Sequence, residues 1–342
     1  MGNKKTILVT GGLGYIGSHT VVRLIEQNFE VVIIDSLANT RLSVLDRIEQ
    51  ITNVRPAFHQ TDLLDFAATN AIFTQYKIDA IIHFAAYAYV NESVENPLKY
   101  YENNLLGMIN LLKAVEKTST NKFIFSSSCT VYGQPDSLPI KEDAPIKHTP
   151  SPYGKTKQMG EEILSDFVKA SKLNAIALRY FNPIGAHPTA LIGELPLGVP
   201  HHILPYITQT AAGIRAELQI FGKDYETPDG TCIRDYIDVN DLADAHIAAV
   251  NRLLQNEALE NSYEVFNIGT GKGVSVAEIV TRFEAATNQK INYRYAERRE
   301  GDVAAVFADS SLAKKVLGWE AKISLEDSLR SAWKWELAQA NG

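Results

Sequence analysis

The sequence is poor in cysteine and has no long apolar run, and both absences narrow the class of protein. Cys129 and Cys232 are the only two cysteines among 342 residues, and their spacing suggests neither a disulfide framework nor a metal site. Such usage is typical of a reducing compartment. No apolar stretch approaches the roughly 20 residues that a membrane-spanning helix needs. Because KTILVT (5–10) already forms a strand-like run, we expect no signal peptide and a cytoplasmic protein.

The chain also lacks a block of basic residues. Lysine and arginine number 33 against 40 aspartates and glutamates, which gives a formal net charge of −7. Nucleic acids and anionic membranes attract proteins through clustered positive charge, so neither is expected as a partner. The hydrophobic share of 45% is ordinary for a globular protein and suffices for a sizeable core.

Strand-like apolar runs alternate with helical patterns in the first half of the chain. The pattern predicts strands at 6–10, 30–35, 80–86, 122–128 and 174–182, another ending near 61–62, and helices at roughly 97–118 and 153–170. Such alternation is typical of βαβ units, whose parallel sheet is covered by helices on both faces.

This rhythm changes near residue 183, where a segment rich in proline and glycine begins. Helices are predicted after it near 202–213, at 238–254, after a capping box at Ser275 and Glu278, and from Ser324. We expect an α/β fold with a Rossmann-type doubly wound parallel sheet in residues 1–182, to which segments near 235–270 return. Residues 183–342 are expected to form a smaller mixed α/β C-terminal lobe.

A glycine-rich loop, TGGLGYIGSHT, follows the first strand. Its glycines fit G-x-G-x-x-G from Gly12 or G-x-x-G-x-x-G from Gly11, and the two spacings share Gly14 and Gly17. The first glycine permits a tight turn, Gly14 lets the backbone approach a pyrophosphate, and Gly17 lets the helix pack on the strand. The helix N-terminus adds unpaired N–H groups and partial positive charge. The loop therefore predicts a dinucleotide site.

Asp35 ends the second predicted strand, 21 residues after Gly14. An acidic residue at this place accepts hydrogen bonds from the adenosine ribose and repels a 2′-phosphate. The prediction is therefore NAD rather than NADP.

Tyr153 and Lys157 lie four residues apart in a predicted helix, which places both side chains on one face. A lysine ammonium and a positive nicotinamide ring would lower the tyrosine pKa from about 10, so that the phenolate can remove a hydroxyl proton. Ser128 ends the fifth predicted strand, where ligands bind in open parallel sheets. Its hydroxyl is suited to bond the reacting oxygen and relay the proton.

These motifs in combination resemble the extended short-chain dehydrogenases/reductases. The stretches HFAA, NNLLG, SSSCTVYG, SPYGKTK, RYFNPIGAHP, FGKDYETPDGTCIRDYI, NIGTGKG and RREGD are similar to those of the UDP-galactose 4-epimerases (UDP-glucose 4-epimerases), over nearly the whole length. The resemblance selects the spacing Gly11, Gly14, Gly17. It implies that NAD takes a hydride from C4 of a UDP-hexose and returns it to the opposite face of a 4-keto sugar, within a homodimer that pairs the helices near 97–118 and 153–170.

The resemblance also implies roles for individual residues. The catalytic residues would be Ser128, Tyr153 and Lys157. The NAD-binding residues of the first domain would be Gly11, Gly14, Tyr15, Ile16, Gly17, Asp35, Asp62, Phe84, Ala85, Asn103, Tyr153, Lys157 and Tyr180. The UDP-sugar site, largely in the C-terminal lobe, would comprise Ser128, Asn182, His202, Phe221, Arg234, Arg299, Asp302 and Val306. No metal is implied.

Related activities on the same fold remain as alternatives. Nucleotide-sugar 4,6-dehydratases share the loop and the tyrosine–lysine pair, but they need an acidic pair where this chain has Cys129 and Thr130. UDP-glucuronate decarboxylases usually carry glutamate at the second of these positions. A non-enzymatic NAD(H)-binding regulator tends to lose the tyrosine, and an NADP-dependent reductase is disfavoured by Asp35.

Two positions bear on the sugar and the cofactor. HFAAYAYVNES also resembles the UDP-xylose/UDP-arabinose 4-epimerases, so pentose activity is a further alternative. Many family members have a lysine where this chain has Ala88, so one cationic cofactor contact is missing. Val306 matches a position beside the sugar C2 substituent, where tyrosine restricts family members to glucose and galactose.

Overall fold

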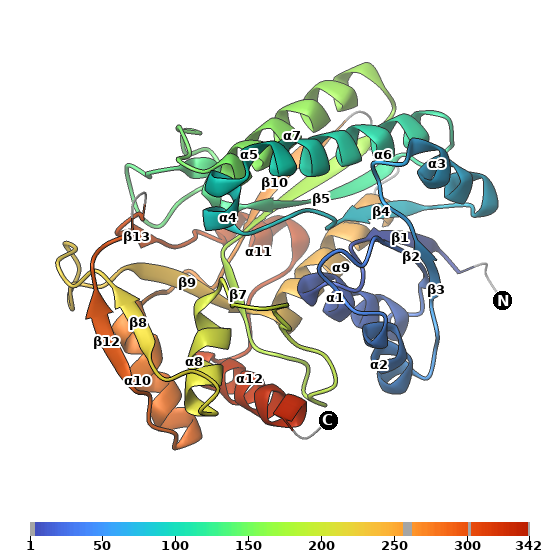
Figure 1. Ribbon diagram of the computed structural model, residues 1–342. Coiled ribbons are helices and arrows are strands. Elements are labelled where there is room, and N and C mark those ends of the chain that lie inside the picture. Colours follow the sequence, from blue (N-terminus) through green and yellow to red (C-terminus); the bar gives the residue numbers. More distant parts are fainter. Residues whose placement is uncertain (1–3, 256–261, 300–301, 341–342) are drawn as a thin grey trace.

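A seven-stranded parallel sheet forms the centre of the molecule in the computed structural model, which describes residues 4–255, 262–299 and 302–340 (Figure 1). The strand order is β10-β6-β5-β4-β1-β2-β3. Its strands are β1 (Thr6–Thr10), β2 (Glu30–Asp35), β3 (Ala57–Gln60), β4 (Ala80–His83), β5 (Lys122–Ser128), β6 (Asn174–Tyr180) and β10 (Tyr263–Ile268). Every adjacent pair is parallel, so their carboxyl ends share one edge. The expected α/β class with a Rossmann-type sheet is confirmed.

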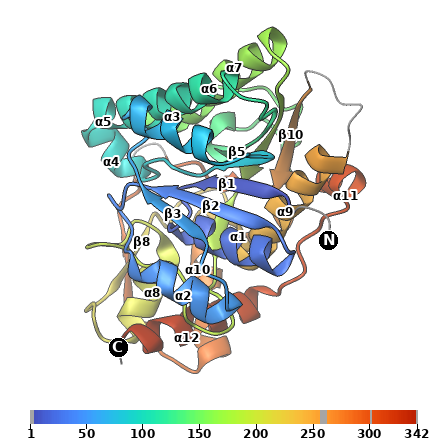
Figure 2. The same ribbon diagram turned by 90° about the vertical axis from the view of Figure 1, so that its right-hand side faces the viewer.

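Helices cover both faces of this sheet, because its strands are apolar on both sides (Figure 2). In β1, Ile7 and Val9 enter one core cluster, whereas Leu8 enters the other. The first cluster lies under α1 (Tyr15–Glu26), α2 (Ser43–Thr52), α9 (Val239–Gln255) and α11 (Ser311–Leu317). The second lies under α3 (Phe66–Gln75), α6 (Gly107–Glu116) and α7 (Pro152–Ala170). The chain therefore returns to this sheet with α9 and β10 after leaving it at residue 180.

The region predicted as one helix over 97–118 is interrupted in the structure. It comprises α5 (Pro97–Tyr101), a π-helical turn (Glu102–Leu106) and α6, and the short helix α4 (Val90–Glu95) precedes it. The Asn104 side chain in that turn accepts a hydrogen bond from Tyr87 N at 2.9 Å and donates to Thr156 Oγ1 at 3.1 Å. An inserted π-turn is frequent beside functional sites, and this one contains Asn103, which lines the pocket described below.

The smaller lobe contains a four-stranded and a two-stranded sheet with three helices. Its elements are β7 (Asn182–Ile184), α8 (Ile203–Ala211), β8 (Leu218–Phe221), β9 (Ile233–Asp238), β11 (Gly273–Ser275), α10 (Val276–Thr287), β12 (Tyr293–Ala296), β13 (Ala305–Val306) and α12 (Leu325–Ala340). An apolar cluster of α8, α10 and α12 forms its core. At the start of α10, Ser275 Oγ accepts from Glu278 N at 3.0 Å, which is one half of the predicted capping box.

Two strand boundaries differ from the sequence prediction. β4 ends at His83 rather than residue 86, and the strand predicted over 174–182 is divided into β6 and β7. Both ends lie where the chain leaves the large sheet to line the pocket. Phe84 and Ala85 directly follow β4, and Pro183 lies within β7, shortly after the end of β6. In the part of the chain that the structure describes, no helix has the length and apolar character needed to cross a membrane.

Candidate active site

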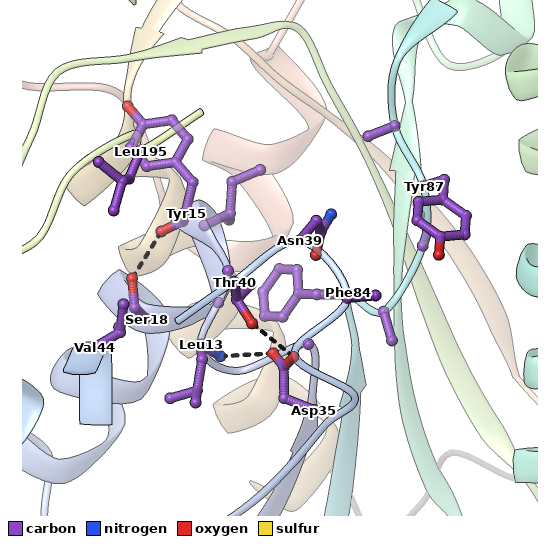
Figure 3. Close-up of a pocket in the computed structure, with 18 of the residues that line it drawn as sticks. Leu13, Tyr15, Ser18, Asp35, Asn39, Thr40, Val44, Phe84, Tyr87 and Leu195 are labelled. Atoms are coloured by element: carbon purple, nitrogen blue, oxygen red, sulfur yellow. Dashed lines mark hydrogen bonds between the residues drawn. The ribbon is translucent and has the colours of Figure 1, made fainter. Parts of the chain in front are cut away.

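One pocket lies along the carboxyl edge of the large sheet, beside the glycine-rich loop (Figure 3). Its lining includes these residues predicted from the sequence: Gly11, Gly14, Tyr15, Ile16, Gly17, Asp35, Asp62, Phe84, Ala85, Asn103, Tyr153, Lys157, Tyr180 and His202. The structure thus brings the predicted cofactor residues together with the tyrosine and lysine of α7. Ligands bind at this edge in open α/β sheets.

The glycine-rich loop has the shape of a phosphate cradle. Gly11 has a φ of +70°, and a Cβ at Gly17 would lie 2.2 Å from Gly11 O. A Cβ at Gly14 would have only Gly11 O closer than 4.0 Å, so this face of the loop is open towards the pocket. No side chain caps the N-terminus of α1 at Gly14. The first N–H groups of that helix therefore remain available to a pyrophosphate, which fits a dinucleotide.

Asp35 is held at the end of β2 by three hydrogen bonds. Its carboxylate accepts from Leu13 N at 3.1 Å, Leu37 N at 2.9 Å and Thr40 Oγ1 at 2.9 Å. Figure 3 shows the bonds from Leu13 and Thr40 converging on the carboxylate below Phe84. Two carboxylate oxygens have about four acceptor positions, so one stays free for a ribose hydroxyl.

Tyr153 and Lys157 lie one turn apart on α7 and are both buried. Lys157 Nζ donates to Ser126 O at 2.7 Å and lies 5.8 Å from the centre of the Tyr153 ring. Burial lowers the Lys157 pKa to about 8, although Glu161 opposes the change. The side chain is therefore mostly charged at neutral pH.

Burial dominates the pKa of Tyr153 in the chain without cofactor. It raises the pKa well above its usual value, with a further contribution from Tyr180, whereas hydrogen bonding with Ser128 opposes the rise. Desolvation dominates because Lys157 directs its ammonium to Ser126 O in an enclosed site. The lowering expected from the sequence includes the charge of a bound nicotinamide ring and stays a prediction for the enzyme with NAD bound.

Ser128 does not line the pocket itself but lies at its edge. It is the last residue of β5, and its Oγ accepts from Thr130 N at 3.2 Å in the short 3₁₀ turn Cys129–Tyr132. The Ser128 hydroxyl hydrogen-bonds with the Tyr153 side chain, an interaction that opposes the rise of the Tyr153 pKa, so the two hydroxyls lie close together. Ser128 and Tyr153, which are 25 residues apart in the sequence, thus lie beside one another in the fold.

The predicted nucleotide-sugar residues form a second group, in the smaller lobe. The Arg299 guanidinium lies 3.8 Å from the centre of the Phe221 ring, and Arg234 Nη2 lies 3.5 Å from Asp302 Oδ1. Val306 pairs in register with Arg234, because β13 runs alongside β9.

Three predicted residues differ in how they relate to the pocket. His202 lines it and pairs with Glu194. Burial lowers the His202 pKa, but the Glu194 carboxylate more than offsets this, so the net shift is upward. Asn182 begins β7, and Val306 packs in an apolar cluster with Val131 and Phe181. Neither Asn182 nor Val306 lines this pocket.

Several pocket residues were not predicted from the sequence. Asn39, Thr40, Arg47, Glu194 and Trp335 all line the pocket. Asn39 and Thr40 closely follow Asp35, so their position after β2 was an available signal. The other three come from segments with no motif. Among the described residues, no group of three or more His, Cys, Asp or Glu is arranged to hold a metal ion.

Comparisons with known proteins agree with this arrangement. Residues 8–332 match the family model described as GDP-mannose 4,6 dehydratase. The UDP-glucose 4-epimerase of Bacillus subtilis is 47% identical over 337 residues, covering 98% of each chain. A UDP-glucose 4-epimerase structure from Stenotrophomonas maltophila, with NAD and formylated UDP-arabinopyranose, has a TM-score of 0.95 and 45% identity over 98% of this chain and 99% of the other.

A further solved structure, the UDP-glucose 4-epimerase of Bifidobacterium longum in complex with NAD⁺ and UDP, has a TM-score of 0.95 and 42% identity. It covers 99% of this chain and 100% of the other. Full-length identity above 40% to named epimerases is more specific than the broader family model. The chain therefore belongs to the UDP-glucose 4-epimerase family of the extended short-chain dehydrogenases/reductases.

Proposed function

We propose that the chain is an NAD-dependent enzyme that interconverts UDP-glucose and UDP-galactose by inverting C4 through a 4-keto intermediate. The observation that carries the proposal is the position of Tyr153 and Lys157 in the same pocket as the open glycine-rich cradle and Asp35. NAD⁺ would supply the hydride acceptor and a positive charge to the pocket that Tyr153 lines.

The chain's own residues account for the remaining chemistry. Tyr153 accepts the proton of the sugar 4-hydroxyl and returns it after the sugar has turned over. Ser128 hydrogen-bonds the reacting oxygen and relays the proton, and Lys157 stabilises the phenolate. Arg234, Arg299 and Asp302 hold the UDP group, since guanidinium groups bind diphosphates well. Binding at that remote group fixes the nucleotide while the sugar presents either face.

The residues after Ser128 disfavour a 4,6-dehydratase. Burial raises the pKa of the Cys129 thiol to about 12, so it is not a base at neutral pH. Thr130 Oγ1 is buried without a hydrogen-bond partner. Neither side chain can supply the acid and base that elimination requires.

Location and assembly form part of the same proposal. We infer a cytoplasmic homodimer, because the free cysteines suit a reducing compartment and an apolar face lies exposed. Val94 of α4, Leu98 of α5, Leu106 of the π-turn and Met159 of α7 are exposed, and α7 packs against the other three elements. Exposed apolar side chains on neighbouring elements suit pairing with a second copy. Sedimentation equilibrium tests it, and a monomer at micromolar concentration would exclude it.

The first prediction concerns the cofactor and the sugar. The purified protein is expected to carry bound NAD and to convert UDP-glucose without added cofactor, because the hydride returns to the same sugar. Asp35 should exclude NADP. Nucleotide released by denaturation identifies the cofactor. Separate incubations with UDP-glucose, UDP-N-acetylglucosamine and UDP-xylose identify the sugar. Bound NADP, or a preference for UDP-xylose, would contradict the proposal.

The second prediction concerns sugar selectivity. Val306 lies in an apolar cluster, is nearly buried and carries a branched Cβ. We expect slower secondary activity on UDP-N-acetylglucosamine, because valine leaves space that tyrosine would fill. Val306→Tyr should abolish this activity and spare UDP-glucose, since only the larger C2 substituent clashes. Measuring kcat/KM for both sugars tests this. An equal loss for both would assign Val306 to core packing alone.

A further inference from the structure

The outer wall of the cofactor pocket is built from the C-terminal helix. Trp335 of α12 lines the pocket and is 5% exposed. Its Nε1 donates to Glu194 O at 2.9 Å, and a Cβ at Gly193 would lie 2.6 Å from the indole ring. The pocket-lining segment 192–197 therefore rests directly on this tryptophan, which is 141 residues from Glu194 in the sequence. The absence of a side chain at Gly193 permits this approach.

Arg47 of α2 meets the same tryptophan from the other domain. Its guanidinium carbon lies 5.3 Å from the centre of the Trp335 ring, and Nη1 and Nη2 both lie 3.4 Å from Gln339 Oε1. Both views show α2 beside α12 (Figures 1 and 2). Arg47, Trp335 and Gly193 thus join three separate segments at one side of the pocket.

The charge of Arg47 is not balanced by an acidic partner. Among the described residues, no carboxylate lies within 4.0 Å of its guanidinium nitrogens, and its two contacts are long bonds to a neutral amide. The nearby Arg55, by contrast, pairs with Asp46 at 2.8 Å and Glu49 at 2.6 Å. A half-buried guanidinium without a counter-charge in an anion-binding pocket is available to a phosphate.

The three carboxylates that line the pocket each have other partners. Asp35 accepts three hydrogen bonds, Asp62 accepts from Leu64 N at 2.9 Å, and Glu194 pairs with His202. None of them forms an ion pair with Arg47 within 4.0 Å. The pocket places this cation in the same space as Gly14 and the N-terminus of α1, which are the groups suited to a pyrophosphate.

We propose that Arg47 and Trp335 retain the dinucleotide, Arg47 by attracting its pyrophosphate and Trp335 by fixing segment 192–197 across the pocket. This inference rests on the proposed function, because it presumes that NAD occupies the pocket. It assigns the C-terminal helix, far in sequence from the glycine-rich loop, a part in holding the cofactor.

Release of labelled NAD tests this proposal directly. The loaded protein is freed of excess label, and loss of label is followed after addition of unlabelled NAD. Arg47→Gln should release NAD about tenfold faster, the loss typical of a charge-assisted contact. Trp335→Phe, which removes the Nε1 donor, should release it about threefold faster. The Arg47→Gln effect should shrink in 1 M salt, because mobile ions screen the charge.

Matched variants separate retention from general stability. Arg55→Gln removes a guanidinium already paired at the surface, and Trp333→Phe changes a tryptophan that packs on Phe283 away from the pocket. Both should release NAD at the wild-type rate. Wild-type release from Arg47→Gln and Trp335→Phe would overturn the inference, as would a faster release explained wholly by a lower melting temperature. Absence of NAD from the wild-type protein would instead refute the proposed function.

Discussion

Tyr153→Phe is expected to lower kcat for UDP-glucose by about 10²–10⁴-fold, the usual contribution of a general base. The phenol is buried beside Ser128 and Lys157, and phenylalanine removes its oxygen without changing the ring. The fold and the bound NAD should remain, because the ring still fills its space. Steady-state turnover, normalised to NAD content, measures the effect.

Two other tyrosines make this test specific. Tyr76 lies at the end of α3, where its hydroxyl bonds His59 Nε2 at 3.1 Å, so Tyr76→Phe should leave kcat unchanged. Tyr180 lies in the same pocket, but its hydroxyl bonds Ser126 and burial raises its pKa to about 12. Tyr180→Phe should therefore cost less than Tyr153→Phe. Near-normal turnover by Tyr153→Phe would remove this tyrosine from the mechanism.

The parts of the site that the sequence predicted are those set by local geometry. The glycines of the loop act within a single strand–turn–helix unit, and Tyr153 and Lys157 share one helix face through their spacing. Asp35 is likewise fixed by the end of its own strand. Short-range rules decide all of these positions, so a single sequence contains enough information to place them.

The parts that the sequence did not predict depend on long-range packing. The π-turn at 102–106 adds a residue to a helical pattern that is continuous in the sequence. Its Asn104 hydrogen-bonds Tyr87 and Thr156, which are distant in the sequence. Segment 192–197 has no period, so nothing indicated that it would rest on Trp335. The strand predicted over 174–182 is divided at residue 181 because β6 pairs with β5 in the large sheet, whereas β7 pairs with β9 in the smaller lobe.

The effect of burial on the Tyr153 pKa could not be predicted from the sequence for a related reason. Charge spacing is visible in the sequence, whereas desolvation depends on how completely the folded chain encloses a group. The motif indicated that a cation is near, but not that its Nζ bonds a backbone oxygen in a buried site. The size of the effect of the Lys157 charge on the Tyr153 pKa therefore has to be measured, because the spacing of the two residues does not determine it.

Lys157→Met is expected to lower kcat about 100-fold near neutral pH, where the wild-type side chain is mostly charged. A unit charge about 5.8 Å from the phenol ring is worth about 3 kcal/mol at an effective dielectric constant of about 20. This corresponds to about two units in the Tyr153 pKa. Methionine has a similar length and no charge, so it keeps the apolar stem and removes the ammonium, whose Nζ lies 5.1 Å from the centre of the Phe125 ring. Lys155, two residues earlier on α7, is half-buried and does not line the pocket, so the control Lys155→Met should retain full activity.

The pH dependence of this loss gives the decisive measurement. The pKa of Lys157 is lowered to about 8 by burial, so its charge is present below that pH and disappears above it. The ratio of wild-type kcat to that of Lys157→Met should therefore be largest below pH 8 and should narrow as the pH rises through 8. The wild-type enzyme and Lys157→Met must be compared at equal NAD content, because Lys157 also lines the cofactor pocket and its loss can weaken NAD binding. A ratio that stays constant from pH 6 to pH 10 would show that Lys157 acts by packing or orientation and not through its charge.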